Sequence, residues 1–230
     1  MHIRKSMIIL FGIVLLSFLI GICFYPRMPE EMASHWNVKG EVDGCMSKFW
    51  GLFLLPLILT AVVLFFLILP KMDPLRANIE EFRKYYDGFI ILLSLFMLSI
   101  QLQVILWNFN IKISPNIIIA IGFSLLFFYL GILSENSKRN WVIGIKTPWT
   151  LSSDIVWQKT HKIDGKLSKI AAIIMLGGVF CRNHVCLLLF LIVPPVAVAV
   201  YAAVYSYFEY QKEMKRSNSA ASSRQEQTRS

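Results

Sequence analysis

The sequence is poor in charged residues. Only 16% of its 230 residues are Asp, Glu, Lys or Arg, while 56% are hydrophobic. Soluble domains carry about 25% charged residues, and the mean hydropathy of this chain is +0.59. This composition excludes an ordinary soluble domain and predicts an integral membrane protein.

Catalytic and metal-binding motifs are also lacking. The chain contains no HExxH, GxSxG, GxxxxGK[ST] or GxGxxG pattern. Its four cysteines include no CxxC pair, which argues against a zinc ribbon or a thioredoxin-type site. We therefore expect no enzyme activity, no catalytic residue, no metal and no cofactor.

The cysteines leave several alternatives open. All four map to one predicted side of the membrane, with two histidines beside them: Cys23, Cys45, Cys181, Cys186, His35 and His184. A disulfide or a soft-metal site is chemically permitted there, but the spacing selects neither. Small buried apolar side chains are the simpler interpretation for Cys23, Cys181 and Cys186.

Apolar runs of membrane-spanning length recur along the chain. Six of them predict an all-α, polytopic membrane protein with about six transmembrane helices: Ser6–Tyr25, Phe49–Leu69, Gly88–Trp107, Ile117–Ser134, Leu167–Cys181 and Val185–Phe208. The fifth run is short and contains Lys169, whose long side chain can reach the interface. The sixth contains Pro194 and Pro195, which predict a kink.

Acidic side chains are missing from all six runs, since the 14 Asp and Glu residues fall outside them. Ion-coupled transporters usually need an acid within the membrane, so their absence disfavours that class. Gln101 and Gln103 in the third run are expected to form hydrogen bonds between helices.

The distribution of basic residues predicts the orientation. Eighteen of the 23 Lys and Arg residues lie in the N-terminus, in 71–87, in 135–169 or after 208. Because Lys and Arg are enriched in cytoplasmic loops, both termini are predicted to be cytoplasmic. We divide the chain into 1–70 (two helices and an outer loop), 71–134 (two helices), 135–208 (a cytoplasmic loop and two helices) and 209–230, a polar tail predicted to be disordered.

The predicted outer loop, 25–50, reads YPRMPEEMASHWNVKGEVDGCMSKFW. His35 is open to three interpretations: a ligand, a pH switch, or a hydrogen-bonded core residue, which is the commonest. The acidic residues of this loop could attract a cationic peptide or a cation, although ordinary solvation explains them as well.

The predicted inner loop, 143–166, contains a turn and a helix. Ser152 is expected to cap the helix and Gly165 to end it. Trp157 and His161, four residues apart, share one helix face. This pattern predicts a short helix lying on the membrane surface, and a docking surface for a cytoplasmic partner is the alternative.

Both loops resemble known families. Pro29, His35, Trp36, Asn37, Gly40, Asp43, Lys48 and Pro56 resemble the DUF1648 domain. Asn140, Gly144, Thr147, Pro148, Trp149, Thr150, Leu151, Ser152, Trp157, Thr160, His161 and Gly165 resemble the signature of the SdpI family. Two positions depart from these patterns: Lys146, where the family usually has Arg, and Cys45, where an aromatic residue is expected.

The resemblance implies a multi-pass protein of the prokaryotic cell membrane that confers immunity to a secreted antimicrobial peptide, a form of bacteriocin resistance. Its partners would be the lipid bilayer, a peptide toxin outside and a cytoplasmic transcriptional repressor inside, with no direct nucleic-acid contact. The implied binding residues are His35, Trp36, Asn37, Gly40 and Asp43 outside, and Asn140, Gly144, Lys146, Thr147, Pro148, Trp149, Ser152, Trp157 and His161 inside. A transporter or exporter of a peptide or small molecule is the alternative function.

Overall fold

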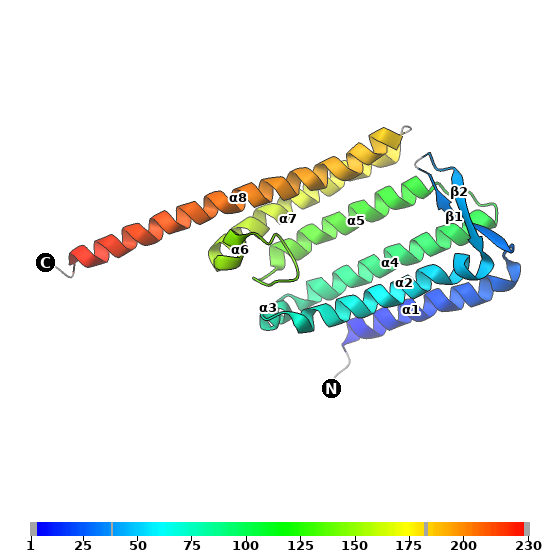
Figure 1. The fold of residues 1–230 in the computed structure, drawn as a ribbon, viewed down its shortest axis with the longest axis horizontal. Helices are drawn as coiled ribbons and strands as arrows, with labels where there is room; N and C mark the ends of the chain where they lie inside the picture. The colour runs from blue at the N-terminus through cyan, green and yellow to red at the C-terminus, as the bar shows by residue number, and fades with distance from the viewer. Residues whose placement is uncertain (1–3, 38, 182–183, 228–230) are drawn as a thin grey trace.

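The computed structural model describes residues 4–37, 39–181 and 184–227. Long helices lie side by side, with a two-stranded β-hairpin at one end and both chain termini at the other (Figure 1). We call these two ends of the molecule the hairpin end and the termini end.

The first half of the chain forms three long helices that pack against one another. They are α1 (Lys5–Phe24), α2 (Lys48–Ile68) and α4 (Arg83–Asn108). The antiparallel strands β1 (Glu31–Trp36) and β2 (Val42–Ser47) connect α1 to α2 at the hairpin end. Shorter helical segments complete this half: η1 (Tyr25–Arg27), η2 (Leu69–Met72) and α3 (Arg76–Glu81).

The second half forms another group of three long helices. They are α5 (Pro115–Asn136), α7 (Asp154–Leu176) and α8 (His184–Gln227), with the short α6 (Pro148–Ser152) and η3 (Gly177–Phe180) between them. Packing of α4 against α5 joins the two halves. The two loop motifs therefore belong to different halves and to opposite ends of the molecule (Figure 1).

The all-α, polytopic membrane architecture is confirmed. Within the described residues, 5 helices are long and apolar enough to cross a membrane: α1, α2, α4, α5 and α8, some with short extensions. Many of their large apolar side chains are exposed, as lipid-facing side chains are (for example Leu15 at 60% and Val200 at 59%). Helix α7 is not among the five, because its first half is polar, although it runs beside α5 and α8 (Figure 1). The sixth crossing therefore stays a prediction.

The prediction that a surface helix ends at Gly165 is wrong. Helix α7 continues through Gly165 to Leu176. A Cβ on Gly165 would lie 2.5 Å from the carbonyl oxygen of Gly131 on α5, and a Cβ on Gly131 would lie 2.7 Å from that of Gly165. Gly165 thus allows two helix backbones to approach closely, and α7 is part of the bundle rather than a helix lying on the membrane.

The polar loop 25–50 contains a β-hairpin, which the sequence interpretation did not include. The long helices extend beyond the predicted apolar runs, so that acidic residues just outside those runs lie on helices near the termini end: Asp87 on α4, Glu135 on α5, Asp164 on α7 and Glu209 on α8. Asp87 is neutralised locally, because it accepts hydrogen bonds from Arg83 (2.8 Å) and Ser6 (2.6 Å).

The predicted disordered tail is also wrong for the residues that the structure describes. Helix α8 runs without interruption through Pro194 and Pro195 and continues to Gln227. Glu209 is 5% exposed and accepts hydrogen bonds from Lys159 on α7 (2.7 Å) and from Lys212 (2.8 Å). These contacts tie the start of the tail to the bundle; residues 228–230 lie outside the described part of the chain.

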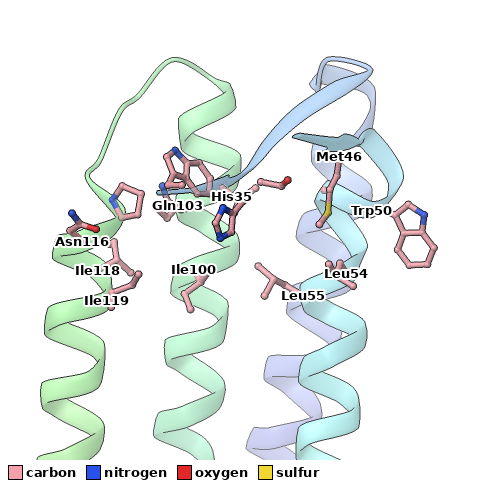
Figure 2. Close-up of a pocket in the computed structure, with 15 residues that line it drawn as sticks. His35, Met46, Trp50, Leu54, Leu55, Ile100, Gln103, Asn116, Ile118 and Ile119 are labelled. Atoms are coloured by element: carbon pink, nitrogen blue, oxygen red, sulfur yellow. The ribbon is translucent and has the colours of Figure 1, made fainter. Parts of the chain in front are cut away.

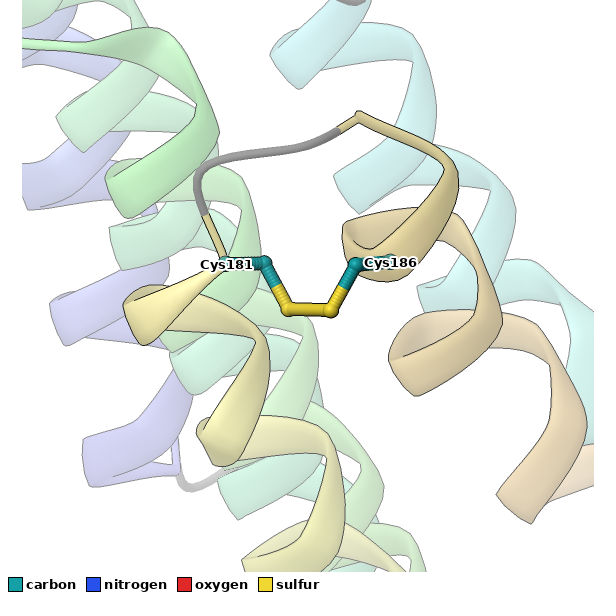
Figure 3. Close-up of a disulfide and its surroundings, with 2 residues drawn as sticks. All are labelled: Cys181 and Cys186. Carbon is teal, nitrogen blue, oxygen red and sulfur yellow. A yellow bond between two sulfur atoms is a disulfide. The ribbon is translucent and has the colours of Figure 1, made fainter.

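A disulfide joins Cys181 to Cys186 across the connection from η3 to α8, where the Cα atoms are 5.8 Å apart (Figure 3). Cys23 and Cys45 are free thiols and are exposed. The interpretation of Cys23, Cys181 and Cys186 as small buried apolar side chains is therefore wrong, because Cys23 is exposed and the other two form a disulfide. The side chain of His184 lies outside the described residues.

Candidate functional site

The tip of the hairpin is built by Asn37. Its Oδ1 accepts hydrogen bonds from the backbone N–H groups of Lys39 (2.8 Å) and Glu41 (3.1 Å), and its backbone N–H donates to the carbonyl of Glu41 (2.9 Å). Gly40 completes the turn with a φ of 79°. The structure therefore gives these two sequence-predicted residues a role in shaping the turn.

The hairpin is fixed to the bundle by Asn108, at the end of α4. Its Oδ1 accepts from the N–H of Ala33 (2.9 Å) and its Nδ2 donates to the carbonyl of Ala33 (3.0 Å), as a neighbouring strand would. On the same strand, Met32 is fully buried and packs against Gly51 and Leu52 of α2. Sequence reasoning missed Asn108, which directly follows an apolar run and carries no local sign of its long-range partner.

His35 and Trp36 lie at the end of β1. His35 is exposed, and its Nδ1 lies 2.5 Å from Oδ1 of Asp43 on β2. The ring of Trp36 packs edge-on against Trp107 of α4, with centroids 5.3 Å apart. The sequence analysis named His35, Trp36 and Asp43 as binding residues of the outer loop, and the structure places them on the two paired strands of the hairpin.

A partly open cavity of about 280 Å³ lies under the hairpin, between α2, α4 and α5 (Figure 2). His35 and Trp36 of the hairpin line it, and side chains such as Leu54, Leu55 and Ile119 form apolar walls. Two polar groups that line it have buried atoms with no hydrogen-bond partner among the described residues: Nε1 of Trp36 and Nε2 of Gln103. An apolar cavity with a few polar groups is typical of a ligand site.

The termini end is built around His161. Its Nε2 accepts a hydrogen bond from the N–H of Ile145 (2.9 Å), and its Nδ1 lies 2.8 Å from the carbonyl of Trp157. These partners assign the neutral tautomer with the proton on Nδ1. The imidazole stacks on Trp157 at 3.9 Å and is 1% exposed, and this burial lowers the pKa of His161 to about 4.

Gly144 passes directly over this ring. Its φ is 107°, and a Cβ there would lie 2.3 Å from Nε2 of His161. Trp157 is fully buried and donates from Nε1 to the carbonyl of Ser137 (3.2 Å). The shared face of Trp157 and His161 therefore points into the protein, which contradicts the predicted helix on the membrane surface.

Asn140 shapes the loop that carries Gly144. It is fully buried, and its Oδ1 accepts from the N–H groups of Val142 (2.9 Å) and Ile143 (2.6 Å). Asp73, which sequence reasoning missed, lies in a different segment of the chain and accepts a hydrogen bond from the N–H of Trp141 (2.8 Å) in the same loop. A lone Asp beside a proline-containing connector offered no signal of this contact.

The short helix α6 has a capping box. Thr147 accepts from the N–H of Thr150 (3.2 Å), the side chain of Thr150 accepts from the N–H of Thr147 (3.0 Å), and Pro148 occupies the first turn. Thr147 also bonds Ser206 of α8 at 3.0 Å, and Trp149 packs edge-on against Tyr207 at 5.2 Å. These residues connect the loop to α8.

Lys146 and Ser152 are exposed, as are Gly144 and Pro148 of the same predicted inner set. Lys146 donates from Nζ to the carbonyl of Val142 (3.0 Å), and Ser152 donates to the carbonyl of Trp149 (3.1 Å). The helix cap is one residue later than predicted, because Ser153 accepts from the N–H of Val156 (3.2 Å). Within the described residues, no group of three or more His, Cys, Asp or Glu side chains gathers as a metal site would.

These features define a class: a multi-pass α-helical protein of the cell membrane, with a hairpin-covered cavity at one end and a tightly hydrogen-bonded loop at the other. Residues 136–206 match the model of the SdpI/YfhL protein family, and residues 12–60 match that of a domain of unknown function, DUF1648. The resemblance of both loops to these two families is therefore confirmed over residues 12–60 and 136–206.

Two relatives from Bacillus subtilis (strain 168) are similar to the chain. It is 26% identical over 206 residues to the immunity protein SdpI, an alignment that covers 89% of this chain and 97% of that protein. It is 33% identical over 51 residues to the uncharacterized membrane protein YbgB, which covers 22% of this chain and 56% of the relative. No solved structure matches the chain.

Proposed function

We propose that this chain is a membrane immunity protein that binds a secreted antimicrobial peptide at its hairpin end. The observation that carries the proposal is the similarity to an immunity protein along 97% of that protein's length. The cavity under the hairpin supports it, because it supplies apolar walls and polar groups where a peptide would arrive. The Cys181–Cys186 disulfide also lies at this end, which suits an oxidising outer face and agrees with the predicted orientation.

The test is survival. The chain is expressed in a sensitive bacterium that lacks any relative, and the cells are exposed to peptides secreted by close kin of the source organism. Wild type should protect, and His35→Ala should protect less at equal membrane level because it removes a lining side chain of the cavity. Glu31→Ala, an exposed change on the same strand, is the matched control. Absence of protection against every peptide would sink the proposal.

The termini end is proposed to recruit a cytoplasmic transcriptional repressor when peptide binds. Since Trp157 and His161 are buried, recruitment must use the exposed side chains of this end, among them Trp141 (55% exposed), Ile155 (54%) and Lys162. The double variant Ile155→Asp, Lys162→Glu should abolish peptide-induced changes in transcription while protection persists. Transcription that responds to the peptide equally in both strains would refute recruitment through this surface.

A transporter of a peptide or small molecule is the second candidate, and Asp164 favours it. This acid is 7% exposed and lines a cavity of about 170 Å³ between α5, α7 and α8, beside Pro195. Burial raises the pKa of Asp164, although Ser134 donates a hydrogen bond to it (2.6 Å). Peptide flux into proteoliposomes that is lost in Asp164→Asn would support transport, whereas a binder without flux would exclude it.

A further inference from the structure

Two glutamines on α4 are buried to similar degrees but differ in their partners. Gln101 is 1% exposed and fully bonded: its Oε1 accepts from Ser17 Oγ (2.7 Å), and its Nε2 donates to the carbonyls of Ser17 (2.9 Å) and Leu52 (3.4 Å). Gln103 is 4% exposed, and its buried Nε2 has no partner among the described residues. Gln101 therefore joins helices as predicted, whereas Gln103 has no such bond to any residue that the structure describes.

Gln103 lines the cavity under the hairpin, near His35 (Figure 2). Trp36 lines the same cavity, and its indole Nε1 is also buried without a partner in the described part of the chain. Burying a polar group without a hydrogen bond costs free energy. Two such groups in one apolar cavity indicate that a ligand with complementary polar atoms binds there.

The chemistry of these groups favours a peptide group over other ligands. A carboxamide offers one acceptor oxygen and two N–H donors, so it pairs with both the C=O and the N–H of a peptide bond. The indole adds one more donor for a carbonyl oxygen. A lipid ester offers acceptors alone and would leave the Gln103 oxygen unused, while the cavity walls, including Leu54, Ile100 and Ile119, suit an apolar side chain.

We propose that this cavity binds one apolar residue of an extended peptide, whose peptide group pairs with Gln103 and Trp36. The proposal rests on the proposed function, because it assigns the binding mode of the secreted peptide. Gln103 and Trp36 select for the main chain, and the apolar walls select for an aliphatic side chain.

The test uses photolabelling of the purified full chain in phosphatidylcholine nanodiscs. The probe is the blocked peptide acetyl-Leu-photoleucine-Leu-amide, in which a diazirine replaces part of the central side chain, and a diazirine-bearing phosphatidylcholine is used in parallel. Labelled residues are mapped by mass spectrometry. We expect the peptide to label the cavity walls, and to label them about tenfold less in Gln103→Leu and in Trp36→Phe, each of which removes a hydrogen-bonding group.

The controls separate binding from folding. Trp107→Phe changes the aromatic partner of Trp36 outside the cavity and should label as wild type does. Gln101→Leu should lower the unfolding midpoint, whereas Gln103→Leu should keep or raise it, because Leu removes an unbonded buried amide. If Leu at 103 lowers the membrane level, Gln103→Met takes its place.

Equal peptide labelling in wild type, Gln103→Leu and Trp36→Phe would overturn the proposal. Labelling of the cavity by the lipid probe but not by the peptide would also overturn it and make the cavity a lipid site. The outcome is separable from that of the proposed function. Protection that persists in cells expressing Gln103→Leu would refute this binding mode alone, whereas peptide labelling without any protection would refute immunity alone.

Discussion

The two ends of the molecule carry family motifs of similar length, but their polar side chains are used differently. At the termini end, Asn140, Thr147 and His161 hydrogen-bond within the protein and hold one loop against α7 and α8. At the hairpin end, Trp36 and Gln103 line a partly open cavity and have buried polar atoms without partners among the described residues; Thr160 has such an atom at the termini end but lines neither of the two cavities described above. Resemblance to a motif therefore does not distinguish residues that build a fold from residues that are available to a ligand.

The largest expected effect tests the structural role of the termini end. Gly144→Ala should lower the free energy of unfolding by about 4 kcal/mol, because a Cβ would strain the positive φ and overlap His161. Thermal unfolding followed by Trp fluorescence in detergent would measure it. Gly12→Ala on α1 is the control, since a Cβ there meets nothing within 4 Å. Equal unfolding midpoints for Gly144→Ala and Gly12→Ala would contradict the structural role of the loop at the termini end.

The next effect depends on pH and is also specific to the termini end. The pKa of His161 is lowered from 6.5 to about 4 by burial, so the folded state favours the neutral ring. That stabilisation is fully present above pH 6.5 and is lost as the pH falls from 6.5 to 4, to a total of about 3 kcal/mol. The unfolding midpoint should fall over this range in wild type.

His161→Gln is the control for that measurement. It removes the titrating ring, so the steep part of the pH dependence between 6.5 and 4 should disappear even though the variant is less stable throughout. A pH dependence that remains unchanged in His161→Gln would mean that other groups govern acid unfolding.

The sequence predicted which residues share one face of a helix better than it predicted what that face contacts. The spacing of Trp157 and His161 correctly placed them on one helix face, where they stack at 3.9 Å. It could not show whether that face meets lipid or protein, because this depends on where the 140–145 loop lies. Likewise, Gly165 within a helix resembles a helix end, and its contact with Gly131 depends on α5, 34 residues earlier.

The hairpin end illustrates the same limit. The sequence interpretation included no hairpin in this loop, and the structure places its turn at Asn37–Glu41 and pairs Gly44 with His35. A helix turns about 200° between Gln101 and Gln103, so the two side chains face different neighbours. The sequence could not show which of them meets a hydrogen-bonding partner, because this depends on the neighbouring helices. The apolar spans were predictable because a bilayer imposes a length and a composition on each of them.

A smaller effect should sharpen the comparison from the hairpin end. Asn108→Ala removes the two hydrogen bonds that hold Ala33 and should cost about 2 kcal/mol of local stability. Hydrogen exchange of residues 31–47 should accelerate while exchange in α7 stays unchanged. Cells that express this variant should also survive the peptide less well. Asn136→Ala, which removes a bond to a carbonyl of its own helix, is the control. Acceleration throughout the bundle would show that the hairpin is not an independent unit.

The smallest predicted effect concerns the contact between α7 and α8. Glu209→Gln weakens its ion pairs with Lys159 and Lys212, both partly exposed, so it should cost only about 1 kcal/mol. Hydrogen exchange should accelerate in residues 206–219 and leave the unfolding midpoint nearly unchanged. Glu31→Gln on the hairpin should leave this segment unaffected. If exchange in 206–219 does not change, then Thr147–Ser206 and Trp149–Tyr207 suffice to hold α8 at the termini end, and the loop itself, rather than the ion pairs, fixes the start of the tail.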